Sequence, residues 1–310
     1  MEYTIRNRCL EVTVSEHGAE LRSIRDRQGT EYLWQGDPRY WEDRAPTLFP
    51  YVGRLTDGKY RLDGKLYSMT IHGFAALSDF TAVSAGPSAL CMELRWSEET
   101  LRIYPRRFVF RVRCALRGRT LSVVYEVKNE DDRILYFGLG GHPGFRVPVR
   151  EGTAFEDYRI RFRRGARPVQ VGFSDACFVN GEDAPFPLDG EDGIPLRHSL
   201  FDRDAIVLRN MGPFAALELA GGERVLTVRA PKLKYLGIWH RPHTDAPYVC
   251  LEPWSSLPSR QGEIAVLEEK KDLKSLAPGE SGSYRWSVEI GGAGGKGGTA
   301  GIDGSSRKRV

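Results

Sequence analysis

Several common signals are missing from this chain of 310 residues. No apolar run is long enough to cross a bilayer, and the opening MEYTIRNRCLEVTV carries charges throughout, unlike a secretory signal. The five cysteines are odd in number and widely spaced, with no CxxC motif, and no Asn-x-Ser/Thr acceptor occurs. This pattern is typical of reduced thiols rather than of a disulfide framework or a zinc site. We therefore expect a cytoplasmic protein with no membrane association.

Signals for nucleotide and nucleic-acid binding are also absent. The net charge of +4 comes from scattered arginines, whereas nucleic-acid binding usually needs a clustered basic face. In GLGGHPG the third glycine of a dinucleotide fingerprint would stand at position 143, which is Pro143. In GGAGGKG a phosphate loop would need a first glycine where Ile290 stands and a Ser or Thr where Gly297 stands. We expect neither a nucleic-acid partner nor a nucleotide.

The chain does contain a strand-like alternation of apolar and polar residues. Apolar side chains fall on one face of residues 108–116 and, after the turn RGRT, on one face of residues 121–127. Period two on both sides of a glycine turn predicts a β-hairpin. The same alternation of apolar and polar residues recurs in LEVTVSE, RVLTVRA and SYRWSVEI. Helical spacing is scarce, and only PRYWED (38–43) and IAVLEEKKDL (264–273) suggest short helices. The predicted fold class is all-β, with many strands in a sandwich or barrel.

The domain organisation follows from length and composition. A length of 310 residues is within the range of a single large β domain, and no linker or repeat interrupts residues 1–290. Residues 291–310 are rich in Gly and Ser and nearly free of apolar side chains. Such a segment buries too little surface to offset its ordering entropy. We predict one domain over 1–290 and a disordered tail over 291–310.

Four segments set an isolated polar side chain among glycines, prolines and aromatics. They are LFPYVGRLTDGKY with Arg54, IHGFA with His72, GGHPGF with His142 and YVCLEPWSSLP with Glu252. SLFDRDAIVL with Asp204 is a fifth candidate. Taken singly, each has an ordinary explanation, such as a solvated arginine, a core histidine, a histidine in a tight turn or a strand-end carboxylate in solvent.

Glu252 and His142 are the candidates with acid–base chemistry. Glu252 ends the strand-like YVCLE, and Pro253 is expected to stop the ladder there. Apolar neighbours should partly desolvate the carboxylate and raise its pKa, which suits a general base near neutral pH. His142 can give or take a proton near physiological pH. The glycines around it are expected to leave the space before it empty for a ligand.

In their order and spacing, APTLFPYVGRLTDGKY, IHGFA, GGHPGF and VCLEPW resemble the aldose 1-epimerase (galactose mutarotase-like) family, in particular its LacX-like branch. The resemblance runs from GAELRSI to LAPGESGSYRWSVEI. It implies a β-supersandwich of two large antiparallel sheets with a sugar on a concave sheet surface. It also implies interconversion of the α and β anomers of an aldose without a cofactor or a metal. We expect a monomer or a homodimer that binds a small-molecule sugar.

Carried over residue by residue, the resemblance makes Glu252 the general base and His142 the general acid. Arg54, His72 and Asp204 match sugar-binding positions. The rings of Trp239 and Phe74 are expected to stack on the C–H surface of a pyranose, although large aromatics in a β-sandwich are more often core. Two alternatives stay open. One is a non-catalytic sugar-binding or sugar-sensing module on the same fold, and the other is an epimerase that acts on a hexose phosphate.

Overall fold

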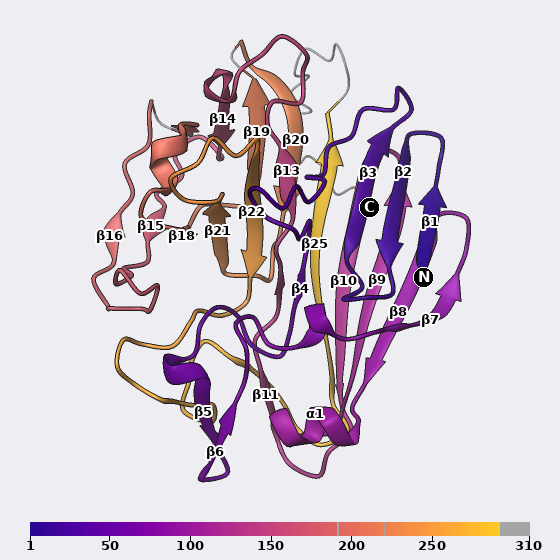
Figure 1. Cartoon of the computed structure of the whole chain (residues 1–310), viewed down its shortest axis with the longest axis vertical. Helices are drawn as coiled ribbons and strands as arrows, with labels where there is room; N and C mark the ends of the chain where they lie inside the picture. The colour runs from indigo at the N-terminus through magenta and orange to yellow at the C-terminus, as the bar shows by residue number, and fades with distance from the viewer. Residues whose placement is uncertain (191, 220, 292–310) are drawn as a thin grey trace, which may run out of the picture.

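Two large sheets dominate the computed structural model, which describes residues 1–190, 192–219 and 221–291 (Figure 1). The first sheet has nine strands, in the spatial order β17 (Gly193–Pro195), β14 (Tyr158–Arg161), β19 (Ala215–Leu219), β20 (Glu223–Arg229), β25 (Ser281–Ile290), β10 (Thr120–Asn129), β9 (Phe108–Arg117), β8 (Ala89–Arg95) and β7 (Thr81–Ala85). The second has eight, in the order β16 (Ala184–Pro185), β15 (Val169–Gln170), β18 (Ile206–Arg209), β21 (Tyr235–Trp239), β22 (Tyr248–Trp254), β12 (Gly140–Gly141) and β4 (Thr47–Leu48), with β13 (Gly144–Arg146) also on β22.

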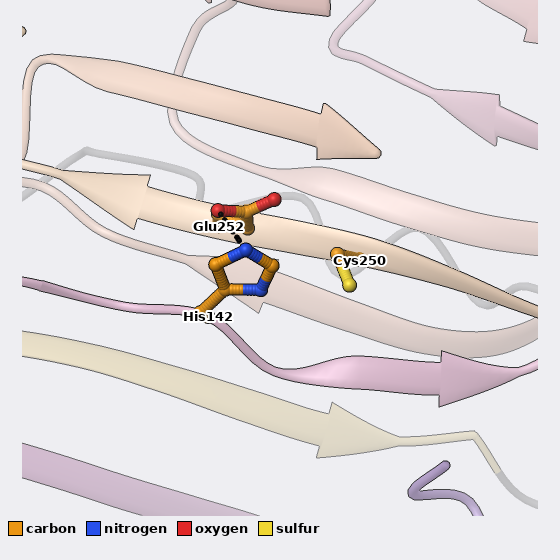
Figure 2. A group of neighbouring side chains, drawn as sticks. All are labelled: His142, Cys250 and Glu252. Atoms are coloured by element: carbon orange, nitrogen blue, oxygen red, sulfur yellow. Dashed lines mark ion pairs between the residues drawn. The ribbon is translucent and has the colours of Figure 1, made fainter. Parts of the chain in front are cut away.

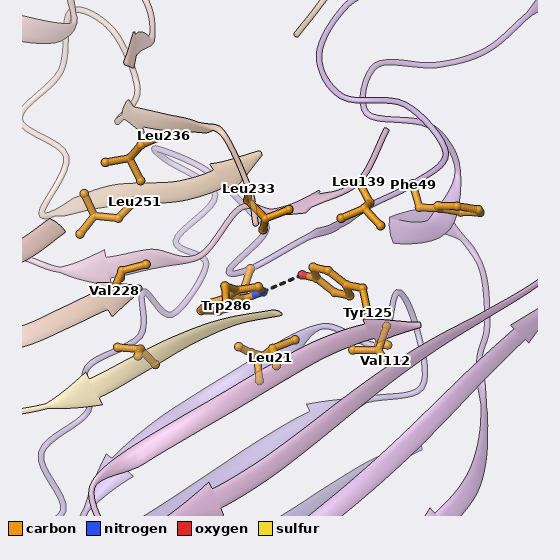
Figure 3. Packing of buried hydrophobic residues seen from close by; sticks show 14 of the residues in the cluster. Leu21, Phe49, Val112, Tyr125, Leu139, Val228, Leu233, Leu236, Leu251 and Trp286 are labelled. Carbon is orange, nitrogen blue, oxygen red and sulfur yellow. Dashed lines mark hydrogen bonds between the residues drawn. The ribbon is translucent and has the colours of Figure 1, made fainter. Parts of the chain in front are cut away.

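The two large sheets share one hydrophobic core. Tyr125 and Trp286 reach into it from β10 and β25, and Leu236 and Leu251 reach into it from β21 and β22 (Figure 3). All four side chains are buried. Because burying one large apolar side chain contributes about 1.5–3 kcal/mol, this core holds one sheet firmly against the other.

Smaller elements complete the fold. They are a sheet of β1 (Glu2–Arg6), β2 (Leu10–Ser15) and β3 (Leu21–Asp26), a sheet of β23 (Ala265–Val266), β5 (Lys59–Leu62) and β6 (Lys65–Ser68), a pair of β11 (Leu135–Phe137) and β24 (Lys274–Leu276), the helix α1 (Glu98–Ile103), and the 3-10 turns η1 (Thr56–Gly58), η2 (Ala75–Leu77), η3 (Phe155–Asp157) and η4 (His198–Phe201). In Figure 1 the β1–β3 sheet lies against β8 and β9. Within the described part of the chain, no helix is both long enough and apolar enough to span a membrane.

The fold class and the hairpin predicted from alternation are confirmed. β9 pairs antiparallel with β10, and Leu116 lies opposite Leu121 across the turn. The residues expected on the inner face of both strands are buried.

All five cysteines are free thiols. The predicted tail lies outside the described residues apart from Gly291, so it stays a prediction.

The two predicted helices are wrong. Residues 38–40 form a turn, and residues 264–273 contribute β23 and further turns. Ala265 and Val266 pair with β5, and Lys270 binds Asp272 and the carbonyl of Pro258, so tertiary contacts override the helical spacing. The helix that does form, α1, follows Ser97, whose side chain accepts a hydrogen bond from the Thr100 N–H. Because this capping box uses Thr rather than Glu or Gln, its sequence signal is weak.

The core hydrogen bond between Tyr125 and Trp286 provides the first test. The Trp286 Nε1–H donates to the Tyr125 hydroxyl at 3.0 Å (Figure 3). In Tyr125→Phe this buried N–H loses its partner, so we expect the free energy of unfolding to fall by about 1–3 kcal/mol in urea titrations. Tyr40→Phe removes an exposed hydrogen bond to Asp245 and serves as the control, with an expected change of about 0.5 kcal/mol or less. Equal effects of the two variants would contradict the assignment.

Candidate active site

Glu252 lies inside strand β22 rather than at its end. The expectation that Pro253 stops the ladder is wrong, because Pro253 pairs with Leu236 and the strand continues to Trp254. A proline removes only its own N–H donor, and the pairs on either side hold the strand in place. Opposite Glu252 on β21 stands Gly237, where a Cβ would lie only 3.2 Å from the Glu252 Cβ. Gly237, which the sequence analysis did not single out, therefore makes room for the carboxylate side chain.

The pairing on the other side of β22 brings His142 to Glu252. Gly140 of β12 lies opposite Trp254, and Gly144 of β13 lies opposite Cys250. His142 falls midway between these two pairs, so the antiparallel register sets it opposite Glu252. The His142 N–H donates to the Pro46 carbonyl at 3.0 Å, which ties the segment to its other neighbour.

The glycines around His142 do not leave empty space, contrary to the expectation from the sequence. A Cβ on Gly138 would lie 2.2 Å from the Ser256 Oγ, and one on Gly140 would lie 2.7 Å from the Pro253 carbonyl. A Cβ on Gly141 would lie 2.9 Å from the Tyr125 hydroxyl, and one on Gly144 would lie 3.0 Å from the Trp41 ring. Protein atoms fill these positions, so glycine is needed for close backbone packing.

His142 and Glu252 form a buried acid–base pair. The His142 Nε2 lies 3.1 Å from the Glu252 Oε2, and the two side chains are 12% and 1% exposed (Figure 2). The Trp254 indole N–H donates to the same oxygen at 3.1 Å. Burial raises the pKa of Glu252 well above its ordinary value, and burial together with His72 lowers the pKa of His142 well below its own. Both shifts disfavour charge, so the pair favours one shared proton and no net charge at neutral pH.

His72 enters the site from the IHGFA segment in a left-handed conformation, with φ of +64°. Its Nδ1 accepts the N–H of Gly53 at 3.1 Å, and its ring meets the His142 ring edge-on with centroids 5.5 Å apart. Burial, and then the charge of Arg54, lower the pKa of His72 to about 4. The imidazole is therefore neutral at pH 7, and because Nδ1 accepts, the proton sits on Nε2. His72 can donate that proton to a ligand.

A cavity of about 530 Å³ brings most of the predicted residues together. Its lining includes Arg54, His72, His142, Asp204, Trp239 and Glu252. Phe74 does not line it: this side chain is buried in the core, where its ring packs against Phe49 and Phe108. The prediction of a stacking role for Phe74 is therefore wrong, because the chain turns at Gly73 and directs the next ring inward.

Two further lining residues escaped the sequence analysis. Trp41 packs its ring 4.9 Å from that of His142, and the Cys177 thiol lies 3.0 Å from the Asp204 carboxylate. Trp41 belongs to the segment predicted as a helix, where its aromatic ring gave no separate signal. Cys177 lies in a loop with no motif around it.

One group in the site has the elements of a metal-ligand set. His142, Cys250 and Glu252 place one nitrogen, one sulfur and one oxygen within 4.8 Å of one another (Figure 2). A zinc ion needs its ligand atoms at about 2.0–2.3 Å. Two ligands at these bond lengths stand roughly 3 Å apart, so the His142–Glu252 distance alone fits a metal as well as a shared proton. Burial raises the pKa of the Cys250 thiol well above its ordinary value, and only a thiolate binds zinc, so the three residues fit a proton-sharing pair better than a metal site.

The fold has counterparts among known proteins. A galactose mutarotase related enzyme from Lactobacillus acidophilus has a TM-score of 0.87 at 32% identity, with 94% of this chain and 97% of that chain covered. A galactose mutarotase-like protein from Lactobacillus casei has a TM-score of 0.88 at 31% identity, with 94% and 100% covered. The fold is therefore galactose mutarotase-like, as expected.

Sequence comparison leads to the family itself. The model of the family described as aldose 1-epimerase matches residues 1–284. Protein LacX of Lactococcus lactis is 28% identical over 298 residues, which cover 94% of this chain and 99% of that protein. The chain belongs to the aldose 1-epimerase family, which confirms the resemblance and its LacX-like character.

The turn at Gly73 provides a test of how the site is assembled. Gly73 has φ of +83°, and a Cβ there would lie 2.2 Å from the Phe49 carbonyl oxygen. Gly73→Ala should therefore lower the free energy of unfolding by well over the roughly 1–2 kcal/mol that left-handed strain alone costs. The matched control is Gly64→Ala, because Gly64 has φ of +71° with nothing within 4 Å. Thermal or urea unfolding that shows equal losses for both variants would contradict the steric argument.

Proposed function

We propose that the protein is a cytoplasmic aldose 1-epimerase that interconverts the α and β anomers of a free aldose. The buried His142–Glu252 pair on the wall of a cavity large enough for a sugar is the observation that carries the proposal. Among the described residues that line the cavity, the Asp, Glu, Lys and Arg side chains outside the neutral His142–Glu252 pair are two arginines and two aspartates, namely Arg54, Arg203, Asp43 and Asp204. Because these charges balance, the cavity offers no net positive field to a phosphate, which favours a free aldose over a hexose phosphate.

The chemistry needs an acid and a base side by side. The anomeric hydroxyl and the ring oxygen of an aldose are bonded to the same carbon, C1. A base and an acid 3.1 Å apart can therefore reach both oxygens of one substrate. Movement of the shared proton from Glu252 to His142 Nε2 gives a carboxylate and an imidazolium. The carboxylate takes the proton of the anomeric hydroxyl while His142 protonates the ring oxygen, and the C1–O5 bond breaks to give the open aldehyde, which returns the pair to its neutral form. Rotation about C1–C2 presents the other carbonyl face, and the reverse transfers close the ring.

The other cavity residues position the sugar. The neutral His72 offers an Nε2–H donor, and Arg54 offers guanidinium donors to hydroxyl groups. Asp204 offers carboxylate oxygens to sugar hydroxyls. Trp239, whose ring lies 5.6 Å from that of His142, provides an apolar face for pyranose C–H groups.

Variants of the pair separate an enzyme from a sugar-binding module. Glu252→Gln keeps the shape of the side chain but cannot act as a base, and His142→Asn keeps a donor but cannot titrate. Each should slow anomerisation of D-galactose or D-glucose by about 10²-fold or more, as measured by polarimetry or NMR exchange. The double variant should be little slower than the poorer single one, because residues that act as a unit are not additive.

Exposed residues supply matched controls for these changes. Glu151→Gln and His17→Asn make the same chemical substitutions outside the cavity and should leave the rate unchanged. A wild-type protein that binds aldoses but does not accelerate anomerisation across a panel of sugars would support the non-catalytic module instead. An unchanged rate in Glu252→Gln would also refute the proposed base.

The pH dependence follows from the two opposite pKa shifts. The active pair carries one proton, and it gains a second only at acidic pH because the pKa of His142 is lowered. It loses its proton only well above the ordinary pKa of a glutamate because the pKa of Glu252 is raised. We expect a bell-shaped profile whose acid limb has its midpoint below about pH 6.5, the ordinary pKa of histidine. An acid limb above that value in a kcat/KM profile would contradict a buried neutral pair.

A further inference from the structure

Asp204 lies at the cavity wall with both carboxylate oxygens already engaged on one side. The Ala205 N–H donates to its Oδ1 at 2.9 Å, and the Cys177 Sγ lies 3.0 Å from its Oδ2. Asp204 and Cys177 are both partly exposed, and both line the cavity that holds His142 and Glu252. The thiol therefore contacts a group that faces the proposed substrate.

The direction of the Cys177–Asp204 hydrogen bond can be assigned. Burial, and then Asp204, raise the pKa of the Cys177 thiol to about 11, so the sulfur keeps its proton at neutral pH. An ionised carboxylate only accepts, so the S–H donates and Oδ2 accepts. Each oxygen then keeps further acceptor capacity for a ligand.

The two residues that form this contact both have an unusual backbone conformation. Cys177 has φ of +63° and Asp204 has φ of +71°, both in the left-handed region that favours glycine. Two loops thus hold unfavourable conformations at the two residues that meet. The Ala205 N–H of its own loop holds one carboxylate oxygen of Asp204, and the thiol of the other loop holds the second.

We propose that Cys177 is a positioning residue, whose thiol donates to Asp204 Oδ2 and orients this carboxylate to accept a hydroxyl of the bound aldose. The inference rests on the proposed function, since it assigns Asp204 to the sugar. Cys177 touches no reacting atom, so it should act on substrate affinity and leave the proton transfers of His142 and Glu252 alone. A serine hydroxyl can donate in the same place, whereas alanine cannot.

Kinetics of variants at position 177 test the assignment. With D-galactose and D-glucose as probes, Cys177→Ala should raise KM by about fivefold and leave kcat within about twofold of wild type. Cys177→Ser should restore the wild-type KM. Cys9→Ala, at the other partly buried cysteine, should change neither parameter. A wild-type KM in Cys177→Ala, or a serine variant as poor as the alanine variant, would overturn the assignment while leaving the epimerase proposal intact.

A second measurement does not depend on catalysis. In Asp204→Asn the thiol loses its carboxylate partner, its pKa falls, and iodoacetamide should alkylate Cys177 about threefold faster or more at pH 8.5. Peptide mass spectrometry follows Cys177 and uses Cys9 in the same samples as the internal reference. If the wild type accelerates no aldose, the proposed function fails, and this rate still decides whether the thiol and the carboxylate are coupled. An unchanged rate at Cys177 would refute the coupling.

Discussion

The close packing of the backbone around His142 onto strand β22 is the constraint on which the site depends. Gly140 lets the chain approach Pro253 and Trp254 of this strand at distances that a Cβ would not allow. Gly144, which pairs with Cys250, has a Cβ position that the Trp41 ring and the Trp34 side chain crowd. Because pairing on both sides fixes the register, His142 has no freedom to slide along the strand. Gly141 lets the same segment pack closely against Tyr125 and Trp286 of the nine-stranded sheet. The position of the imidazole is thus set by the packing of both large sheets.

Burial determines which protonation state the His142–Glu252 pair favours. An exposed histidine and glutamate 3.1 Å apart would form a screened ion pair of little consequence. Here the carboxylate is 1% exposed, so removing two charges from water costs more than their attraction returns. The neutral form with one shared proton is therefore favoured over the ion pair of carboxylate and imidazolium.

The sequence predicted the parts of this molecule that depend on local pattern. Alternation in 108–127 predicted a hairpin, and the spacing of the segments with Arg54, His72, His142 and Glu252 predicted the family. The predictions that were wrong concern features that depend on contacts between distant segments. Pro253 stays in the strand because of its partner Leu236, and Phe74 turns into the core because Gly73 packs against Phe49. The glycines at 138–144 were noticed, but whether they face a ligand or a neighbouring strand is decided only when the sheets come together.

The site divides into a rigid part and a strained part. Glu252 stands on strand β22, and His142 stands between β12 and β13, which both pair with β22. In contrast, His72, Cys177 and Asp204 all lie in loops with positive φ. Left-handed residues other than glycine persist only where surrounding contacts hold them, and such strain is often concentrated at functional sites. Here the contacts are the Gly53 N–H on His72 and the thiol on Asp204. In the proposed function, changes in these loops would alter which sugar hydroxyls are recognised without moving the acid–base pair, which would separate the choice of substrate from the proton-transfer chemistry.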